Sequence, residues 1–149
     1  MTFQPPPIIP SVREDGQPLL FWSVMIPAYN PGRNYLEQTI RSVLKQDPGP
    51  EQMQIEVVDD CSPKVDVAAL VQEIAGERVS VSRTPKNLGL AGCWNTCIER
   101  SRGKWVHILH QDDFLAPGFY DALRQLTERH PSMALVAAVR FLLMKMMSF

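Results

Sequence analysis

Short apolar runs alternate with stretches of helical periodicity along most of the chain. Four runs have the length and β-branched content typical of buried strands: residues 19–26, 55–58, 79–82 and 105–109. After the first run, Leu36, Ile40 and Val43 recur at the spacing of one helical face, and the later intervals show similar periodicity. The alternation predicts parallel strands joined by right-handed helical crossovers. We therefore expect an α/β fold with a mostly parallel, Rossmann-like sheet and helices on both of its faces.

The limits of the expected helices follow from capping and turn residues. Asn34 can cap the first helix, and Glu37 three positions later would complete a capping box. In the third helix, Trp94 and Ile98 mark the inward side, and Gly103 supplies the glycine that often follows a helix C-terminus.

The length of 149 residues corresponds to one domain. Three segments are expected: a proline-rich, flexible lead-in at 1–18, the domain at 19–139, and an atypical apolar tail at 140–149. A last strand is expected at 133–139. The apolar C-terminal stretch is interrupted by Arg140 and Lys145 and is shorter than the roughly 20 residues of a membrane-spanning helix, so no membrane span is expected.

Two of the expected strands end in adjacent carboxylates, Asp59-Asp60 and Asp112-Asp113. Because parallel strands end at the same edge of a sheet, both pairs should lie along one edge, where α/β proteins usually bind ligands. Neighbouring carboxylates repel each other unless a cation or a hydrogen-bond donor lies between them. Oxygen ligands of this kind suit Mg²⁺ or Mn²⁺. The same residues are also common in solvated turns and at helix N-termini.

Composition argues against nucleic acid as a binding partner and bears on the cellular location. The formal net charge is −1 and the pI is about 6.3, so the chain lacks the basic surface of a nucleic-acid-binding protein. The three cysteines fit neither a zinc site nor a paired disulfide framework, which favours a reducing, cytoplasmic location. Cys93 and Cys97 share one helical face and are expected to be small buried residues.

A nucleoside diphosphate would match the chemistry of the acidic edge. A divalent ion held by Asp112 or Asp113 could act as a Lewis acid on the diphosphate. The carboxylate of Asp60 could accept from the nucleoside, and Tyr29 could stack on the base. Structural explanations also exist, since Tyr29 can be an ordinary loop tyrosine and Asp59 can cap its local turn. Turn-forming roles likewise explain Asn87 and Gly89.

Five segments together resemble the family 2 glycosyltransferases, which have the GT-A fold. The matching segments, in chain order, are Ser-Val-Met-Ile-Pro-Ala-Tyr-Asn at 23–30, Leu-Glu-Gln-Thr-Ile-Arg-Ser-Val-Leu-Lys-Gln at 36–46, Ile-Glu-Val-Val-Asp-Asp-Cys-Ser at 55–62, Asn-Leu-Gly-Leu-Ala-Gly at 87–92 with Asn95, and Leu-His-Gln-Asp-Asp at 109–113 with Pro117-Gly118. The resemblance covers residues 21–139, and it rests on the order and spacing of segments that are individually weak.

The resemblance implies metal-assisted, inverting transfer of a sugar from a nucleotide-sugar, UDP-linked, to an acceptor hydroxyl. It implies that Asp60 reads the base, and uracil suits a carboxylate because its N3–H is a donor. The residues implied for nucleotide-sugar binding are Pro27, Ala28, Tyr29, Asn30, Asp59, Asp60, Asn87, Gly89, Asn95 and Asp112. Those implied for the divalent metal, Mn²⁺ or Mg²⁺, are His110, Asp112 and Asp113.

The chain departs from the family pattern in three respects. His110 stands where many members have Asp, and Trp94 stands where Arg is frequent. The carboxylate that serves as general base in inverting members belongs to an acceptor-binding half that would follow Val139, so the catalytic residue is unassigned. A catalytically incomplete nucleotide-binding fragment or module is therefore the alternative function, and self-association is expected from a sheet that lacks its remaining cover. A phospho-receiver domain fits poorly because no lysine ends a suitable strand.

Overall fold

The computed structural model describes residues 19–132. The elements in chain order are β1 (Leu20–Ala28), α1 (Arg33–Leu44), β2 (Met53–Asp59), α2 (Val67–Ala75), a 3₁₀ turn η1 (Gly76–Arg78), β3 (Ser80–Arg83), α3 (Gly89–Arg100), β4 (Gly103–Ile108) and α4 (Phe119–Arg129). The lead-in expected at 1–18, the strand expected at 133–139 and the tail expected at 140–149 lie outside the described residues.

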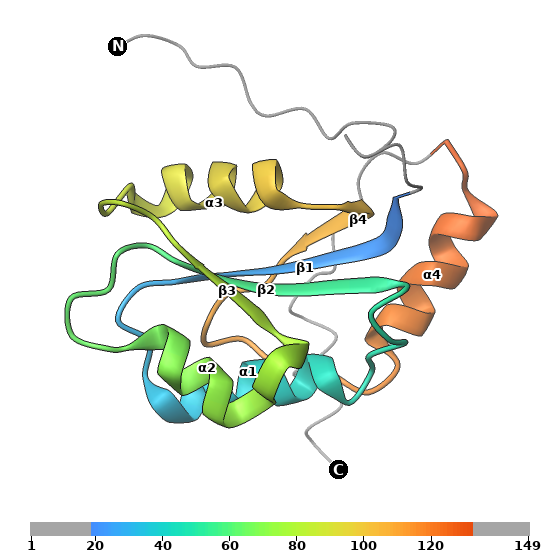
Figure 1. Ribbon diagram of the computed structural model, residues 1–149. Coiled ribbons are helices and arrows are strands. Elements are labelled where there is room, and N and C mark those ends of the chain that lie inside the picture. The colour runs from blue at the N-terminus through green and yellow to red at the C-terminus, as the bar shows by residue number, and fades with distance from the viewer. Residues whose placement is uncertain (1–18, 133–149) are drawn as a thin grey trace, which may run out of the picture.

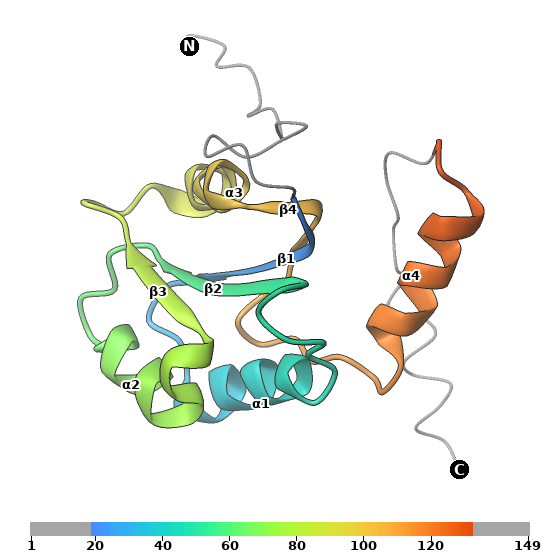
Figure 2. The ribbon, with the colours of Figure 1, turned by 45° about the vertical axis from the view of Figure 1, so that its right-hand side comes forward.

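The four strands form one parallel sheet in the order β3-β2-β1-β4. Figure 1 shows α3 on one face of the sheet and α1 with α2 on the other, whereas α4 lies at the side of the sheet. The view in Figure 2 separates α4 clearly from the other three helices. The predicted α/β fold, with a parallel sheet between helices, is confirmed. Each described helix is too short or too polar to cross a membrane.

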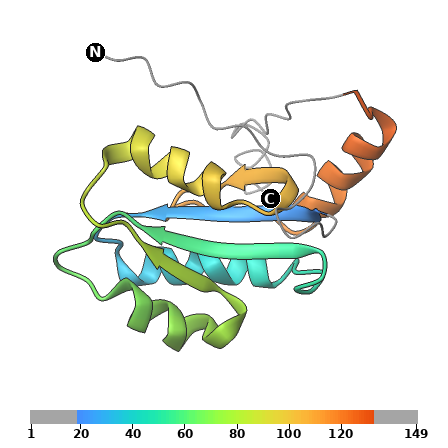
Figure 3. The same cartoon turned by 45° about the horizontal axis from the view of Figure 1, so that its top comes forward.

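Strand alternation divides the core into two layers. One layer joins alternate residues of β1 and β2 to α1 and α2, and its fully buried members include Val24, Ile26, Leu36 and Ile40. The other layer, between the sheet and α3, is smaller and contains Met25, Val58, Cys93 and Cys97. Figure 3 shows how closely α3 lies over the sheet. The two central strands are thus buried on both faces, as their continuous apolar runs predicted.

The inward side of α3 differs from the prediction. Cys93 and Cys97 are buried, whereas Trp94 and Ile98 are only half-buried. The small thiols fit between the helix and the sheet, and the larger side chains are displaced to the flank. The prediction that the two cysteines are small buried residues is confirmed.

Two predicted helix limits were wrong. The N-cap of α1 is Gly32, and no side chain caps the helix; Asn34 lies within the first turn, and Glu37 pairs with Arg41 at 2.8 Å instead. The helix α3 ends at Arg100, and Gly103 is the first residue of β4. A Cβ atom on Gly103 would lie 2.4 Å from the backbone N of Ser23, so this glycine permits close strand pairing and does not terminate the helix.

The strand β4 was expected to be buried but is largely half-buried. Among the described residues it pairs only with β1 and therefore lies at the edge of the sheet.

Candidate functional site

A cavity of about 350 Å³ lies at the carboxyl ends of β1, β2 and β4. It is lined by Pro27, Ala28, Tyr29, Asp60, Asn87, Gly89, Leu90, Cys93, His110, Gln111 and Asp112. One carboxylate from each acidic strand end therefore reaches the same cavity, as the parallel arrangement predicted. Four predicted site residues are not among the lining residues: Asn30, Asp59, Asn95 and Asp113.

Asp60 joins the end of β2 to the start of α3. One carboxylate oxygen accepts from the backbone N–H of Leu88 at 2.8 Å, and the other accepts from the Gly89 N–H at 3.0 Å. The Thr84 hydroxyl lies 3.1 Å from the first oxygen and 2.8 Å from the Lys86 carbonyl, so its single proton favours Lys86. The Asp60 side chain therefore caps the first turn of α3, where backbone donors need a partner. Since Asp60 lines the cavity and a carboxylate has about four acceptor positions, it keeps acceptor capacity for a ligand donor.

Asp59 has a structural role. It is 2% exposed, forms an ion pair with Arg83 and accepts from the Ser62 N–H at 3.0 Å. Adjacent residues at a strand end point to opposite sides, so only one carboxylate of the pair can face the cavity.

The three predicted asparagines occupy different environments. Asn30 has φ 45° and accepts from the Lys64 N–H at 3.0 Å, which ties the end of β1 to the loop after β2. Asn87 lines the cavity and accepts from the Gly89 N–H at 3.0 Å, as in an Asx turn. Asn95 is half-buried within α3.

The second acidic strand end is a tight turn. The Asp113 N–H donates to the His110 carbonyl at 3.1 Å, so Asp112 lies within a turn that spans 110–113. Asp112 is exposed, and the rings of His110 and Trp94 are in edge contact with centroids 5.4 Å apart. The two residues at which the chain departs from the family pattern are thus in contact with each other.

Gln111, which the sequence pattern did not identify as a site residue, contacts the backbone of Tyr29. Its side-chain oxygen accepts from the Tyr29 N–H at 2.8 Å, and its amide donates to the Tyr29 carbonyl at 3.4 Å. The Gln111 side chain therefore links the residue that follows β1 to the turn that follows β4. Its position next to Asp112, a predicted ligand residue, was the sequence signal that could have identified Gln111. Leu90 and Cys93 were also missed, because their cavity-facing sides depend on the orientation of α3.

The donor set for a metal is small. Within residues 19–132, no group of three or more His, Cys, Asp or Glu side chains could hold a metal ion. Asp112 and His110 both line the cavity, whereas Asp113 does not. Mg²⁺ in nucleotide sites typically uses one or two carboxylates together with substrate phosphates. The donor set fits a metal that arrives with a diphosphate and does not form a complete cage by itself.

Comparisons with known proteins agree with this architecture. The family model described as Glycosyl transferase family 2 matches residues 23–144. An uncharacterized protein of Mycobacterium tuberculosis is 38% identical over 120 residues, which are 79% of this chain and 35% of that protein. The putative teichuronic acid biosynthesis glycosyltransferase TuaG of Bacillus subtilis is 38% identical over 92 residues, 61% of this chain and 35% of TuaG.

A solved structure has the same fold. The crystal structure of S. aureus TarS 1-349 superposes with a TM-score of 0.64 at 24% identity, over 75% of this chain and 33% of that chain. The chain spans about a third of the length of these relatives.

Proposed function

Since the chain belongs to glycosyl transferase family 2, we propose that its cavity binds the nucleotide-sugar donor, UDP-linked, of a transferase that glycosylates an acceptor hydroxyl. The observation that carries the proposal is the meeting of Asp60 and Asp112 in one cavity at the carboxyl edge of a parallel sheet. UDP is supported further by TarS, a relative 26% identical over 120 residues, which has been crystallised with UDP and with UDP-GlcNAc.

The nucleoside end of the donor belongs at β1 and β2. The remaining acceptor position of Asp60 suits the N3–H donor of uracil. The Tyr29 ring is 45% exposed and can stack on the base. Pro27 and Ala28, which precede Tyr29 at the end of β1, also line the cavity and would contact the base.

The diphosphate end belongs at the turn after β4. Asp112, with His110, would hold a divalent ion, whereas the predicted ligand Asp113 does not line the cavity. The ion would stabilise the negative charge that develops on the leaving diphosphate. In inverting transfer, a carboxylate deprotonates the acceptor hydroxyl as it attacks the anomeric carbon.

A second candidate function is donor binding without transfer. In this assignment the two carboxylates that line the cavity among the described residues, Asp60 and Asp112, both serve the donor. The general base would then be a carboxylate outside this lining, and the cavity could bind a nucleotide-sugar without carrying out the transfer.

Calorimetric titration of the chain with UDP tests the donor site. We expect UDP to bind more tightly with Mn²⁺ than with EDTA, because the metal offsets repulsion between the diphosphate and Asp112. CDP should bind more weakly than UDP, because the cytosine N3 is an acceptor and would face the Asp60 carboxylate.

Asp112→Asn should remove most of the Mn²⁺ effect, and Glu99→Gln, at an exposed position of α3 outside the cavity, is the matched control. The proposal would be refuted if UDP did not bind, or if UDP bound equally well in Mn²⁺ and in EDTA and CDP bound as tightly as UDP.

A further inference from the structure

Three polar side chains on α1 and just after it face the segment that follows β4. Thr39 and Ser42 lie about one turn apart on α1, and Gln46 lies two residues beyond the end of the helix at Leu44. Thr39 is fully buried, Ser42 is 9% exposed and Gln46 is half-buried. Buried polar side chains require hydrogen-bond partners, and these three have partners in the backbone of residues 111–120.

Thr39 lies under the turn that carries Asp112. Its hydroxyl oxygen is 2.6 Å from the Asp113 carbonyl, 3.0 Å from the Gln111 carbonyl and 2.9 Å from the Tyr35 carbonyl of its own helix. A hydroxyl has a single proton to donate. The shortest of the three contacts favours donation to Asp113, the last residue of the turn.

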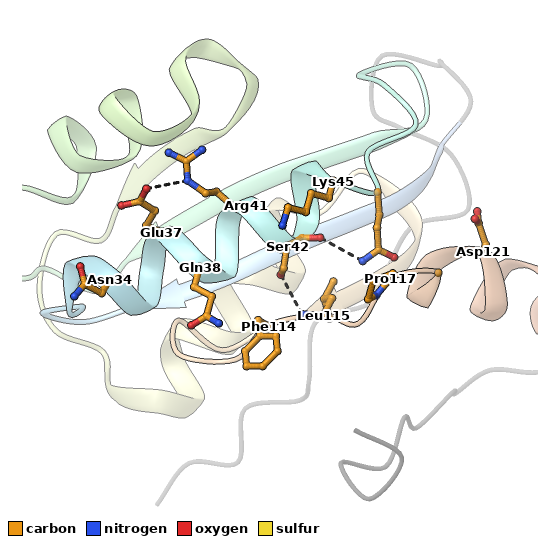
Figure 4. A pocket seen from close by; sticks show the side chains of 12 residues that line it. Asn34, Glu37, Gln38, Arg41, Ser42, Lys45, Phe114, Leu115, Pro117 and Asp121 are labelled. Carbon is orange, nitrogen blue, oxygen red and sulfur yellow. Dashed lines mark hydrogen bonds and ion pairs between the residues drawn. The ribbon is translucent and has the colours of Figure 1, made fainter. Parts of the chain in front are cut away.

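Ser42 and Gln46 hold the segment that follows. The Ser42 hydroxyl accepts from the Leu115 N–H at 3.0 Å while donating to the Thr39 carbonyl at 2.7 Å. Gln46 donates to the Ala116 carbonyl at 3.0 Å and accepts from the Tyr120 N–H at 3.4 Å. Figure 4 shows Ser42 pointing from α1 toward Leu115.

Packing contributes little on the outer side of this segment. A groove of about 810 Å³ lies between α1 and the segment, lined among others by Gln38, Lys45, Phe114 and Pro117. Figure 4 shows the side chains of this groove, with Phe114 at its rim; Phe114 is 41% exposed. Leu115 packs against the core, so the hydrogen bonds from Thr39, Ser42 and Gln46 add to this apolar contact in holding the segment.

We propose that Thr39, supported by Ser42 and Gln46, is a positioning residue that fixes the 110–113 turn so that Asp112 meets the metal and diphosphate of the donor. The proposal rests on the proposed function. The turn is anchored on its other side by the Leu109 N–H, which donates to the Met25 carbonyl of β1 at 2.9 Å. Thr39 supplies the anchor on the helix side, and without it the turn can shift toward the groove.

The test compares Thr39→Val with Thr39→Ser in UDP titrations of the 149-residue chain. Valine keeps the side-chain shape and removes the donor, whereas serine keeps the donor. We expect Thr39→Val to weaken UDP binding in Mn²⁺ by about threefold to tenfold, the range that one lost hydrogen bond spans. UDP binding in EDTA should change less than about twofold, and Thr39→Ser should restore the Mn²⁺ effect.

The matched control is Thr127→Val, because Thr127 is 6% exposed and its hydroxyl donates to the Arg124 carbonyl of its own helix at 2.9 Å, with no other hydrogen-bond partner within residues 19–132. Ser42→Ala serves as the second variant if Thr39→Val does not fold. An unchanged Mn²⁺ effect in the variants overturns the positioning role and leaves the donor site intact. Equal weakening with and without metal also overturns it, since that result indicates general destabilisation. A wild-type chain without metal-dependent UDP binding refutes both proposals.

Discussion

Asp60 serves two purposes at the residue scale. Its carboxylate accepts two hydrogen bonds from backbone N–H groups at the start of α3, and it also lines the cavity. Asp112 differs, because it is exposed and lies in a turn. The two residues that are proposed to bind the donor therefore contribute differently to stability. Substitution of Asp60 should lower both stability and UDP binding, whereas substitution of Asp112 should lower mainly UDP binding.

We predict that Asp60→Ala lowers the free energy of unfolding by about 1–2 kcal/mol, because it removes the carboxylate that accepts from the Leu88 and Gly89 N–H groups at the N-terminus of α3. Asp112→Ala should change the free energy of unfolding by less than about 0.5 kcal/mol. Both variants should lose UDP affinity. Urea denaturation followed by circular dichroism measures the stabilities, and similar costs for the two variants would contradict the capping role of Asp60.

At the scale of elements, the pairing of β1 with β4 brings the second acidic end to the cavity. This pairing needs a close approach at Gly103, whose N–H donates to the Ser23 hydroxyl at 2.7 Å. The Ser23 hydroxyl also accepts from the Arg102 N–H at 2.9 Å and lies 2.6 Å from the Gln54 side-chain oxygen. The start of β4 is therefore set by backbone contact with β1, far from the cavity that the strand serves.

Gly103→Ala should destabilise the chain by about 2–3 kcal/mol, because the added Cβ would lie 2.4 Å from backbone atoms that cannot move aside. Gly32→Ala is the matched control. Gly32 has φ −67°, and a Cβ there would meet only the exposed ring of Tyr35 at 3.1 Å, so a cost under about 1 kcal/mol is expected. Thermal unfolding of both variants checks the difference, and equal costs would argue against a tight β1–β4 approach.

At the scale of the whole molecule, α4 docks on the edge of the sheet through aromatic contacts. The His107 ring of β4 stacks on Phe119 with centroids 5.3 Å apart, and its Nδ1 lies 3.0 Å from the Tyr120 hydroxyl. Burial lowers the pKa of His107 to about 4, against a smaller opposing effect from Asp113. Packing of α4 on β4 therefore favours the neutral form of His107, which makes the stability of the folded chain depend on pH.

Since the folded-state pKa of His107 lies below the unfolded value of about 6.5, the unfolded chain binds more protons between these two values. The contribution is fully present above about pH 6.5 and is lost as the pH falls toward 4. We expect His107→Gln to remove roughly 2–3 kcal/mol of the pH dependence of unfolding between pH 7 and pH 4.5. Urea titrations at several pH values test this, with the exposed His130→Gln as control; parallel profiles for wild type and His107→Gln would contradict it.

Much of this architecture could be predicted from local pattern. Runs such as 55–58 specify strands because both faces of the central sheet are apolar, and Leu36, Ile40 and Val43 specify the buried face of α1. Parallel topology predicted that the two acidic strand ends lie on one edge of the sheet, and the strand order β3-β2-β1-β4, with β2 and β4 flanking β1, brings them into one cavity. The hydrophobic pattern did not identify the buried face of α3, where two pairs of apolar residues could face the sheet. The space between α3 and the sheet accommodates Cys93 and Cys97, and the larger Trp94 and Ile98 lie beside it.

The sequence by itself determined the order of the elements, the parallel sheet and the edge at which the acidic residues gather, because hydrophobic periodicity and the crossover rule act on residue pattern. Only the tertiary structure decided that Asp60 faces the cavity while Asp59 pairs with Arg83, and that Gln111 and Thr39 hold the turn around Asp112. The direction of a side chain at the end of a strand depends on how the backbone turns there and on which distant groups satisfy its hydrogen bonds.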